Sequence, residues 1–169
     1  MRRLSLLPSL MTCKRATAAA EMALVTPMLI ILMFGAFELG NYFLSEHVVV
    51  KAVRDGARYA ARQSFTNYTC PGATVDATMT ANVQEITRTG KLSGGTARLP
   101  GWTNNSTVTV AISCETVGTT YSGIYNGMTN IPVVTVSASV PYDSLFNNLG
   151  FTSIGLLLNA ESQSAVMGI

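Results

Sequence analysis

The chain has 169 residues, a formal net charge of +2, and a composition that is 48% hydrophobic and 12% charged. This length accommodates one modest domain in addition to a membrane-spanning helix. The small net charge argues against a nucleic-acid partner, which a strongly basic domain would favour.

Residues 1–16 form a short basic leader without an acidic residue, followed by a much longer apolar run. The basic residues of this leader are Arg2, Arg3, Lys14 and Arg15. The positive-inside rule favours a cytoplasmic location for such a segment. A second basic cluster follows the apolar run, so the charge count alone leaves the orientation open. The composition and the cysteine pair of the remainder suit export, and we therefore expect a cytoplasmic N-terminus.

Residues 17–44 are predicted to be a transmembrane helix. Sixteen uncharged residues separate Glu21 from Glu38, and small or apolar residues extend this run on both sides. About 20 helical residues span a bilayer core of about 30 Å, so the run is long enough. A carboxylate in such a helix is costly unless it finds a partner or lies at the headgroups, which makes Glu21 and Glu38 the informative residues. We find no specific role for Glu38 beyond solvation at the opposite interface or a contact with neighbours near Lys51.

Three small or cyclic residues inside the apolar run affect how the helix can pack. Pro27 removes one helical hydrogen bond, which membrane helices tolerate with a kink or a local unwinding. Gly35 and Gly40 form a small-residue patch that would let another helix approach closely. Glycine is also simply common in membrane helices, so this patch is a weak indication of packing.

Residues 45–63 are predicted to continue the same helix as an amphipathic extension, giving about 45 helical residues in all. One apolar stripe at helical spacing consists of Val49, Val53, Ala57 and Ala60. Another face carries Lys51, Arg54, Arg58 and Arg62. Asp55 is expected to pair with Lys51 or Arg58 along the helix, and Gly56 to be a mild penalty to helix formation.

Residues 64–169 are predicted to form an α+β domain outside the cytoplasm. We expect a loop over 64–72, a second helix over 74–89 that ends at Gly90, and a loop over 91–105. Strands are predicted over 107–116, 133–142 and 154–164, with a long loop over 117–132 and a turn or short helix over 143–150. Trp102 is expected to be a packing residue. Three antiparallel strands with one apolar face would give the amphipathic helix its seat.

The cysteines fall on both sides of the apolar run. Cys13 precedes it, whereas Cys70 and Cys114 follow it. If the later part lies outside the cytoplasm, Cys70 and Cys114 are available for a disulfide, and the alternative is two separate buried thiols.

The sequence contains no recognisable set of catalytic residues. His47 is the one histidine, so no histidine pair exists for a metal site or a catalytic dyad. No phosphate-binding loop and no nucleophile elbow are present. We therefore expect no enzyme, no metal site and no cofactor.

The segments 15–27, 37–40 and 53–61 (RATAAAEMALVTP, FELG and VRDGARYAA) together resemble TadE/TadG-like pseudopilins. These are minor pilin-like proteins of the tight-adherence (Flp) type IV pilus system of bacteria. The resemblance covers residues 14–61, and the rest of the chain is similar to the family only in its general layout.

The resemblance implies processing by a prepilin peptidase on the cytoplasmic side. The bond cut is then Ala16–Thr17, with Glu21 at the fifth mature position. This chain has Ala16 where glycine usually precedes the cut, and Met22 where an aromatic residue is common. Glu21 would pair with the free amine of a neighbouring subunit's Thr17 and set the axial register. The alternative is that the carboxylate of Glu21 is solvated among the lipid headgroups.

The function implied is that of a minor pseudopilin in pilus assembly or initiation, anchored in the bacterial inner membrane with its C-terminal domain in the periplasm. The partners implied are other pilin-like subunits, the prepilin peptidase, inner-membrane assembly proteins and lipid. The alternative is a single-span scaffold of the pilus machinery that does not enter a fibre.

Overall fold

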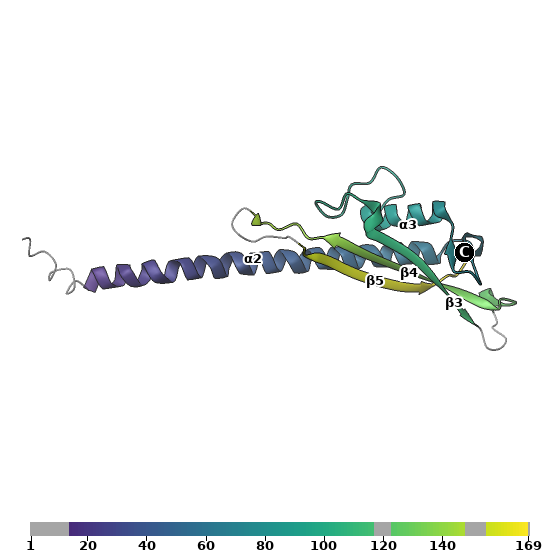
Figure 1. The fold of residues 1–169 in the computed structure, drawn as a ribbon, viewed down its shortest axis with the longest axis horizontal. Helices are drawn as coiled ribbons and strands as arrows, with labels where there is room; N and C mark the ends of the chain where they lie inside the picture. The colour runs from purple at the N-terminus through teal and green to yellow at the C-terminus, as the bar shows by residue number, and fades with distance from the viewer. Residues whose placement is uncertain (1–13, 117–122, 148–154, 169) are drawn as a thin grey trace, which may run out of the picture. The chain divides into compact units, whose positions relative to one another are not determined.

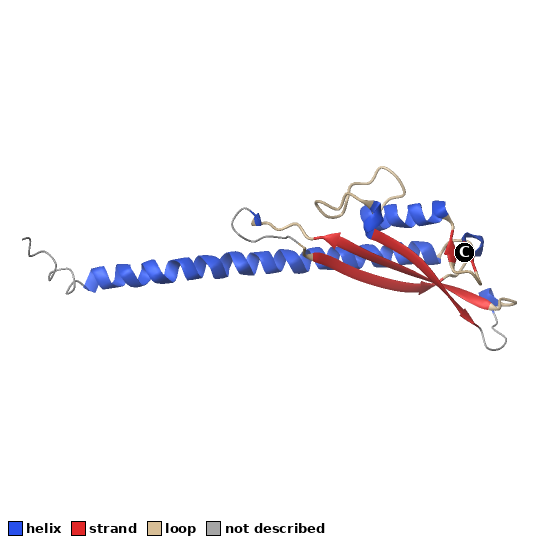
Figure 2. Cartoon of the chain, viewed as in Figure 1, coloured by secondary structure: helices blue, strands red, loops and turns tan. Residues whose placement is uncertain are grey.

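The structure, a computed structural model, describes residues 14–116, 123–147 and 155–168. The α-helices are α2 (Lys14–Ala61) and α3 (Ala77–Thr89), and the 3₁₀ helices are η1 (Phe65–Asn67), η2 (Asn105–Thr107) and η3 (Gly123–Tyr125). The strands are β1 (Tyr68–Thr69), β2 (Thr74–Val75), β3 (Val108–Thr116), β4 (Asn130–Pro141) and β5 (Leu157–Ala165). The predicted α+β class is confirmed (Figure 2).

The chain divides into two compact units, Met1–Gly40 and Asn41–Ile169. The described part of the first unit is helical throughout and belongs to α2. This helix has 48 residues, close to the predicted length. It continues as a helix through Pro27; of the predicted kink or local unwinding, no unwinding is present there.

Helix α3 begins at Ala77, three residues later than the sequence predicts. The reason is Asp76, whose carboxylate accepts hydrogen bonds from the backbone N–H groups of Thr78 (2.9 Å) and Met79 (3.0 Å) and so caps the helix. The two residues before this cap form β2, which pairs with β1, so the predicted loop over 64–72 also contains a short 3₁₀ helix and a strand. The predicted stop at Gly90 is confirmed, because Gly90 has φ 80° and caps the helix in the left-handed conformation.

The three longer strands form one antiparallel sheet in the order β3-β4-β5. Val136 at its centre pairs with Val110 of β3 and with Ser162 of β5. The predicted alternation is confirmed: the buried residues of the sheet are Val108, Ile112, Pro132, Val134, Val136, Ala138, Val140 and Leu158. Strand β4 starts at Asn130, earlier than expected. Residues 117–122 of the predicted loop, 148–150 of the predicted turn or short helix, and 154 of the predicted third strand lie outside the described residues.

The C-terminal half of α2 supplies the helical side of the core. All members of the predicted apolar stripe are completely buried, namely Val49, Val53, Ala57 and Ala60. They belong to one hydrophobic cluster with the inner face of the sheet, with Met79 and Val83 of α3, and with Trp102, which is a packing residue as predicted. Figure 1 shows α3 beside this half of α2, and the predicted seat of the amphipathic helix is therefore confirmed.

Candidate functional site

The residues that the sequence singles out for assembly lie on the N-terminal part of α2. The most apolar window of this helix is 0% buried, and its length and composition allow it to cross a membrane. Large apolar side chains are exposed around it, including Met22, Leu24, Met28, Ile31 and Leu32. A helix that exposes apolar side chains all round has no stable place in water, so this part of α2 requires an apolar environment.

The predicted cleavage bond, Ala16–Thr17, lies in the first turn of α2, which begins at Lys14. Glu21 follows one turn later and is exposed. No residue in the described ranges forms a hydrogen bond or an ion pair with Glu21. Within residues 17–116, 123–147 and 155–168, its carboxylate is therefore without a compensating group.

The other predicted packing residues lie farther along the same helix. The hydroxyl of Thr26, the neighbour of Pro27, donates to the carbonyl oxygen of Met22 at 2.6 Å. A Cβ added at Gly35 or Gly40 would meet no atom within 4 Å, so nothing in the described chain requires glycine there. Glu38 is half-buried.

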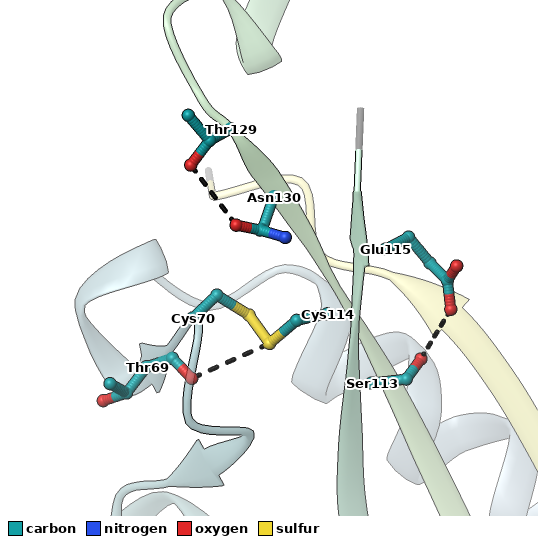
Figure 3. The surroundings of a disulfide bond; sticks show 7 residues. All are labelled: Thr69, Cys70, Ser113, Cys114, Glu115, Thr129 and Asn130. Atoms are coloured by element: carbon teal, nitrogen blue, oxygen red, sulfur yellow. Dashed lines mark hydrogen bonds between the residues drawn. A yellow bond between two sulfur atoms is a disulfide. The ribbon is translucent and has the colours of Figure 1, made fainter. Parts of the chain in front are cut away.

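The second unit contains the predicted disulfide between Cys70 and Cys114. The two Cα atoms are 5.8 Å apart, and the residues are separated by 44 positions in the sequence. Cys70 directly follows β1 and Cys114 lies on β3, so the bond ties the short two-stranded sheet to the edge of the long one (Figure 3). The carbonyl oxygen of Thr69 lies 3.8 Å from the sulfur of Cys114.

A polar network joins α3 to η2. The guanidinium of Arg88 donates to both carboxylate oxygens of Glu85, at 2.9 and 3.1 Å, and also to the side-chain oxygen of Asn105. The amide of Asn105 donates to Glu85 in turn, at 3.0 Å. The hydrogen bonds from Arg88 and then from Asn105 lower the pKa of Glu85 below its ordinary value. The network is structural, since it fixes the segment that leads into β3.

Two further contacts attach distant segments to α2. Asp55 forms an ion pair with Arg98 at 2.8 Å, so its predicted pairing with Lys51 or Arg58 along the helix is wrong. The loop that contains Arg98 returns to α2 and brings a guanidinium within reach of the carboxylate. The hydroxyl of Tyr68 donates to the carbonyl oxygen of Ala60 at 2.6 Å, and burial raises the pKa of Tyr68 to about 12.

The basic residues predicted to share a face of the amphipathic extension are all exposed, namely Lys51, Arg54, Arg58 and Arg62. His47 is exposed as well. Among the described residues, no group of three or more His, Cys, Asp or Glu side chains is placed to hold a metal ion. That the chain is not an enzyme stays a prediction.

These features define the class of protein: an apolar helix long enough to cross a membrane, followed in the same chain by a disulfide-linked α+β domain. Residues 16–58 match the family described as TadE-like protein, which confirms the resemblance seen in the sequence over this stretch. The match covers about a quarter of the chain, all of it within α2. No curated protein and no solved structure matches the chain.

Proposed function

We propose that the protein is a minor pseudopilin of a tight-adherence (Flp) type IV pilus that acts in pilus assembly or initiation. The observation that carries the proposal is Glu21, an acidic residue without a partner in the described chain, within an exposed apolar helix and a TadE-like segment. A role between subunits gives this carboxylate a partner that the described residues of its own chain do not supply.

The partner we propose for Glu21 is the free amine that cleavage creates at Thr17 of a neighbouring pilin-like subunit. An unpaired carboxylate in hydrocarbon is costly, and an ammonium group placed against it lowers that cost. The pair forms only when two helices have the correct axial offset, so it selects one register among the many that apolar helices allow. Cleavage of the Ala16–Thr17 bond by a prepilin peptidase is a requirement of this arrangement.

The anchoring that goes with this function is a single span over residues 17–44 in the inner membrane. The N-terminus is cytoplasmic, where the peptidase acts, and the domain after residue 44 is periplasmic. The disulfide between Cys70 and Cys114 supports this orientation, because disulfides persist in the periplasm and are rare in the cytosol. The protein has no catalytic activity of its own and works through inner-membrane assembly proteins and other pilin-like subunits.

A second candidate is a single-span scaffold of the same machinery that is never cleaved and never enters a fibre. The observation that favours it is Ala16, since glycine usually stands before the cut in the family that the sequence resembles. Both candidates share the anchor and the periplasmic domain, and they differ in the state of the N-terminus.

Mass spectrometry of the N-terminus separates the two. The full-length chain is expressed in cells with and without the prepilin peptidase of a Tad system, extracted from membranes and sequenced from its N-terminal peptide. The pseudopilin proposal expects Thr17 as the first residue only when the peptidase is present. An intact leader in both cells, with Ala16→Gly cleaved in the same experiment, would establish the scaffold.

A further inference from the structure

The domain exposes a small apolar patch, formed by Leu145, Leu156 and Leu157, at the described ends of the connection between β4 and β5. The exposed fractions of these side chains are 61%, 47% and 47%. The exposed residues elsewhere on the sheet include the polar Thr109, Ser139 and Asn159. These leucines are available for an apolar contact at this end of the domain.

The leucine patch lies beside the residues of α2 that end the apolar run. The side-chain amide of Asn41 donates to the hydroxyl of Tyr142 at 2.9 Å and to the carbonyl oxygen of Asp143 at 3.5 Å. The rings of Tyr42 and Tyr142 meet edge to face, with centroids 5.2 Å apart. A hollow of about 110 Å³ at this junction is lined by Asn41, Ser45, Leu99, Pro100, Leu145 and Leu158, among others.

Chain connectivity fixes where this junction lies relative to a bilayer. Asn41 to Leu44 are the last residues of the apolar run, so they lie at the membrane surface whenever the run spans the membrane. Tyr42 is one of the amphipathic aromatic residues that membrane interfaces favour. Tyr142 and Asp143 are hydrogen-bonded to Asn41, and the backbone N–H of Tyr142 donates to the carbonyl oxygen of Leu156 at 3.0 Å, so the leucine patch lies at the end of the domain where Asn41 is.

We propose that the leucine patch inserts into the outer, periplasmic leaflet of the membrane as a second contact beside the transmembrane helix. This inference rests on the membrane anchoring in the proposed function. Apolar side chains at this level are buried by the boundary between headgroups and acyl chains. Three partly exposed leucines cover far less than the roughly 800 Å² per partner of a stable protein interface, so lipid is the occupant that suits the patch.

A second contact has a consequence for the domain. One helix leaves the domain free to rotate about the helix axis, whereas a helix and a loop together fix which face points to the membrane. The domain then presents its basic α2 face and its sheet in a defined orientation until the helix leaves the bilayer. The leucine patch must leave lipid at the same step.

The test measures the depth of fluorescent labels in the full-length protein, reconstituted in vesicles of phosphatidylethanolamine and phosphatidylglycerol that carry spin-labelled acyl chains. A Cys13→Ser background keeps the disulfide and removes the remaining thiol. Single labels are introduced through Leu145→Cys and Leu157→Cys. Matched controls are Gln163→Cys, exposed near the far end of β5, and Phe37→Cys, exposed within the apolar run.

The proposal expects lipid quenching at positions 145 and 157 to be at least twice that at 163. Equal quenching at 145, 157 and 163, with strong quenching at 37, overturns the lipid contact and leaves the anchoring intact. A third outcome is that lipid does not quench the labels at 145 and 157, while their fluorescence emission shifts to shorter wavelength as the protein concentration rises. This outcome overturns the lipid contact in favour of a contact between copies of the chain. Absence of quenching at 37 overturns the anchoring itself, and with it both proposals.

Discussion

Gly56 of α2 lies so close to Thr87 of α3 that a Cβ at position 56 would overlap the threonine hydroxyl oxygen. Both residues are buried, and the hydroxyl of Thr87 is held in place by donating to the carbonyl oxygen of Val83 at 2.7 Å. The glycine therefore allows two helices to approach closely. From the sequence alone it predicts only a mild penalty to helix formation, which understates its importance.

Replacement of this glycine tests how tightly the two helices are packed. We expect Gly56→Ala to lower the free energy of unfolding by about 1–3 kcal/mol through overpacking. The gain in helix propensity, about 1 kcal/mol, offsets only part of this loss. The measurement is denaturant unfolding of the full-length protein in micelles, followed by the fluorescence of Trp102, which is fully buried.

The control for this prediction is the double variant Gly56→Ala with Thr87→Ala. Removal of the threonine hydroxyl makes room for the added methyl group, so the double variant should be more stable than the sum of the two single changes predicts. Additive losses would contradict the contact between the two positions.

The disulfide between Cys70 and Cys114 should contribute substantially to stability. In the chain-entropy description, a closed loop of about 45 residues stabilises the folded state by about 3–4 kcal/mol. The double variant Cys70→Ala with Cys114→Ala should lose this amount in the same unfolding assay. Cys13→Ser is the matched control and should unfold as the original does, whereas equal stability of the double variant would contradict the prediction.

The network around Glu85 should make the free energy of unfolding depend on pH in the acidic range. The pKa of Glu85 is lowered by Arg88 and Asn105, so the folded protein binds this proton less tightly than the unfolded chain does. The stabilisation is present above the ordinary pKa, near 4.5, and is lost as the pH falls through the lowered value. At neutral pH we expect Glu85→Gln to be less stable by about 1 kcal/mol, because the pair is partly exposed.

The difference between Glu85→Gln and the original should disappear as the pH falls below the lowered pKa, since both side chains are then uncharged. Unfolding curves at a series of pH values check this. Glu161→Gln, a change at an exposed residue of β5, serves as the comparison. If the difference in unfolding free energy between Glu85→Gln and the original protein stays constant with pH, the effect comes from side-chain packing and not from charge.

Periodic apolar residues were sufficient to predict the architecture. The spacing of Val49 and Val53 indicates a helix face, the alternation of Val134 and Val136 indicates a strand face, and both faces are completely buried. Period and burial are linked because each regular structure turns its side chains by a fixed angle per residue. The pairing of Cys70 with Cys114 was also predictable, on the condition that the domain lies outside the cytoplasm, because these are then the two cysteines available to each other.

Contacts between residues distant in the sequence were not predicted. Asp55 offers Lys51 and Arg58 as partners one turn away, yet it pairs with Arg98, 43 positions later. Rules based on neighbouring residues cannot evaluate a loop that returns to the helix. The glycine at position 56 was the available indication of a close approach, since a glycine inside a helix often has a packing reason.

At the N-terminal site, one chain alone predicts the helix that carries Glu21 but not the partner of Glu21. The structure places Glu21 in an exposed helix and offers it no partner among the described residues. The groups proposed to act on this segment, a peptidase and a neighbouring subunit, belong to other molecules. The partner of Glu21 is therefore identified by assembly assays.

Loss of the carboxylate at Glu21 should strongly reduce assembly without impairing membrane insertion. Glu21→Ala makes the helix more apolar, so insertion into the bilayer is retained or improved. The pair with the neighbouring amine is lost, and since about 1.4 kcal/mol corresponds to tenfold in an equilibrium, we expect incorporation to fall by about tenfold or more. The measurements are the amount of protein in alkali-washed membranes and the number of pili per cell.

Two comparisons make the Glu21 prediction specific. Glu38→Ala removes the other acidic residue of the apolar helix, for which no partner subunit is proposed, and should have the weaker effect on piliation. A leader that cannot be cleaved withholds the amine at Thr17, so adding Glu21→Ala to it should cause no further loss, because both changes remove the same pair. Normal piliation of Glu21→Ala would count decisively against the pair, and additive losses would show that Glu21 acts through some other group.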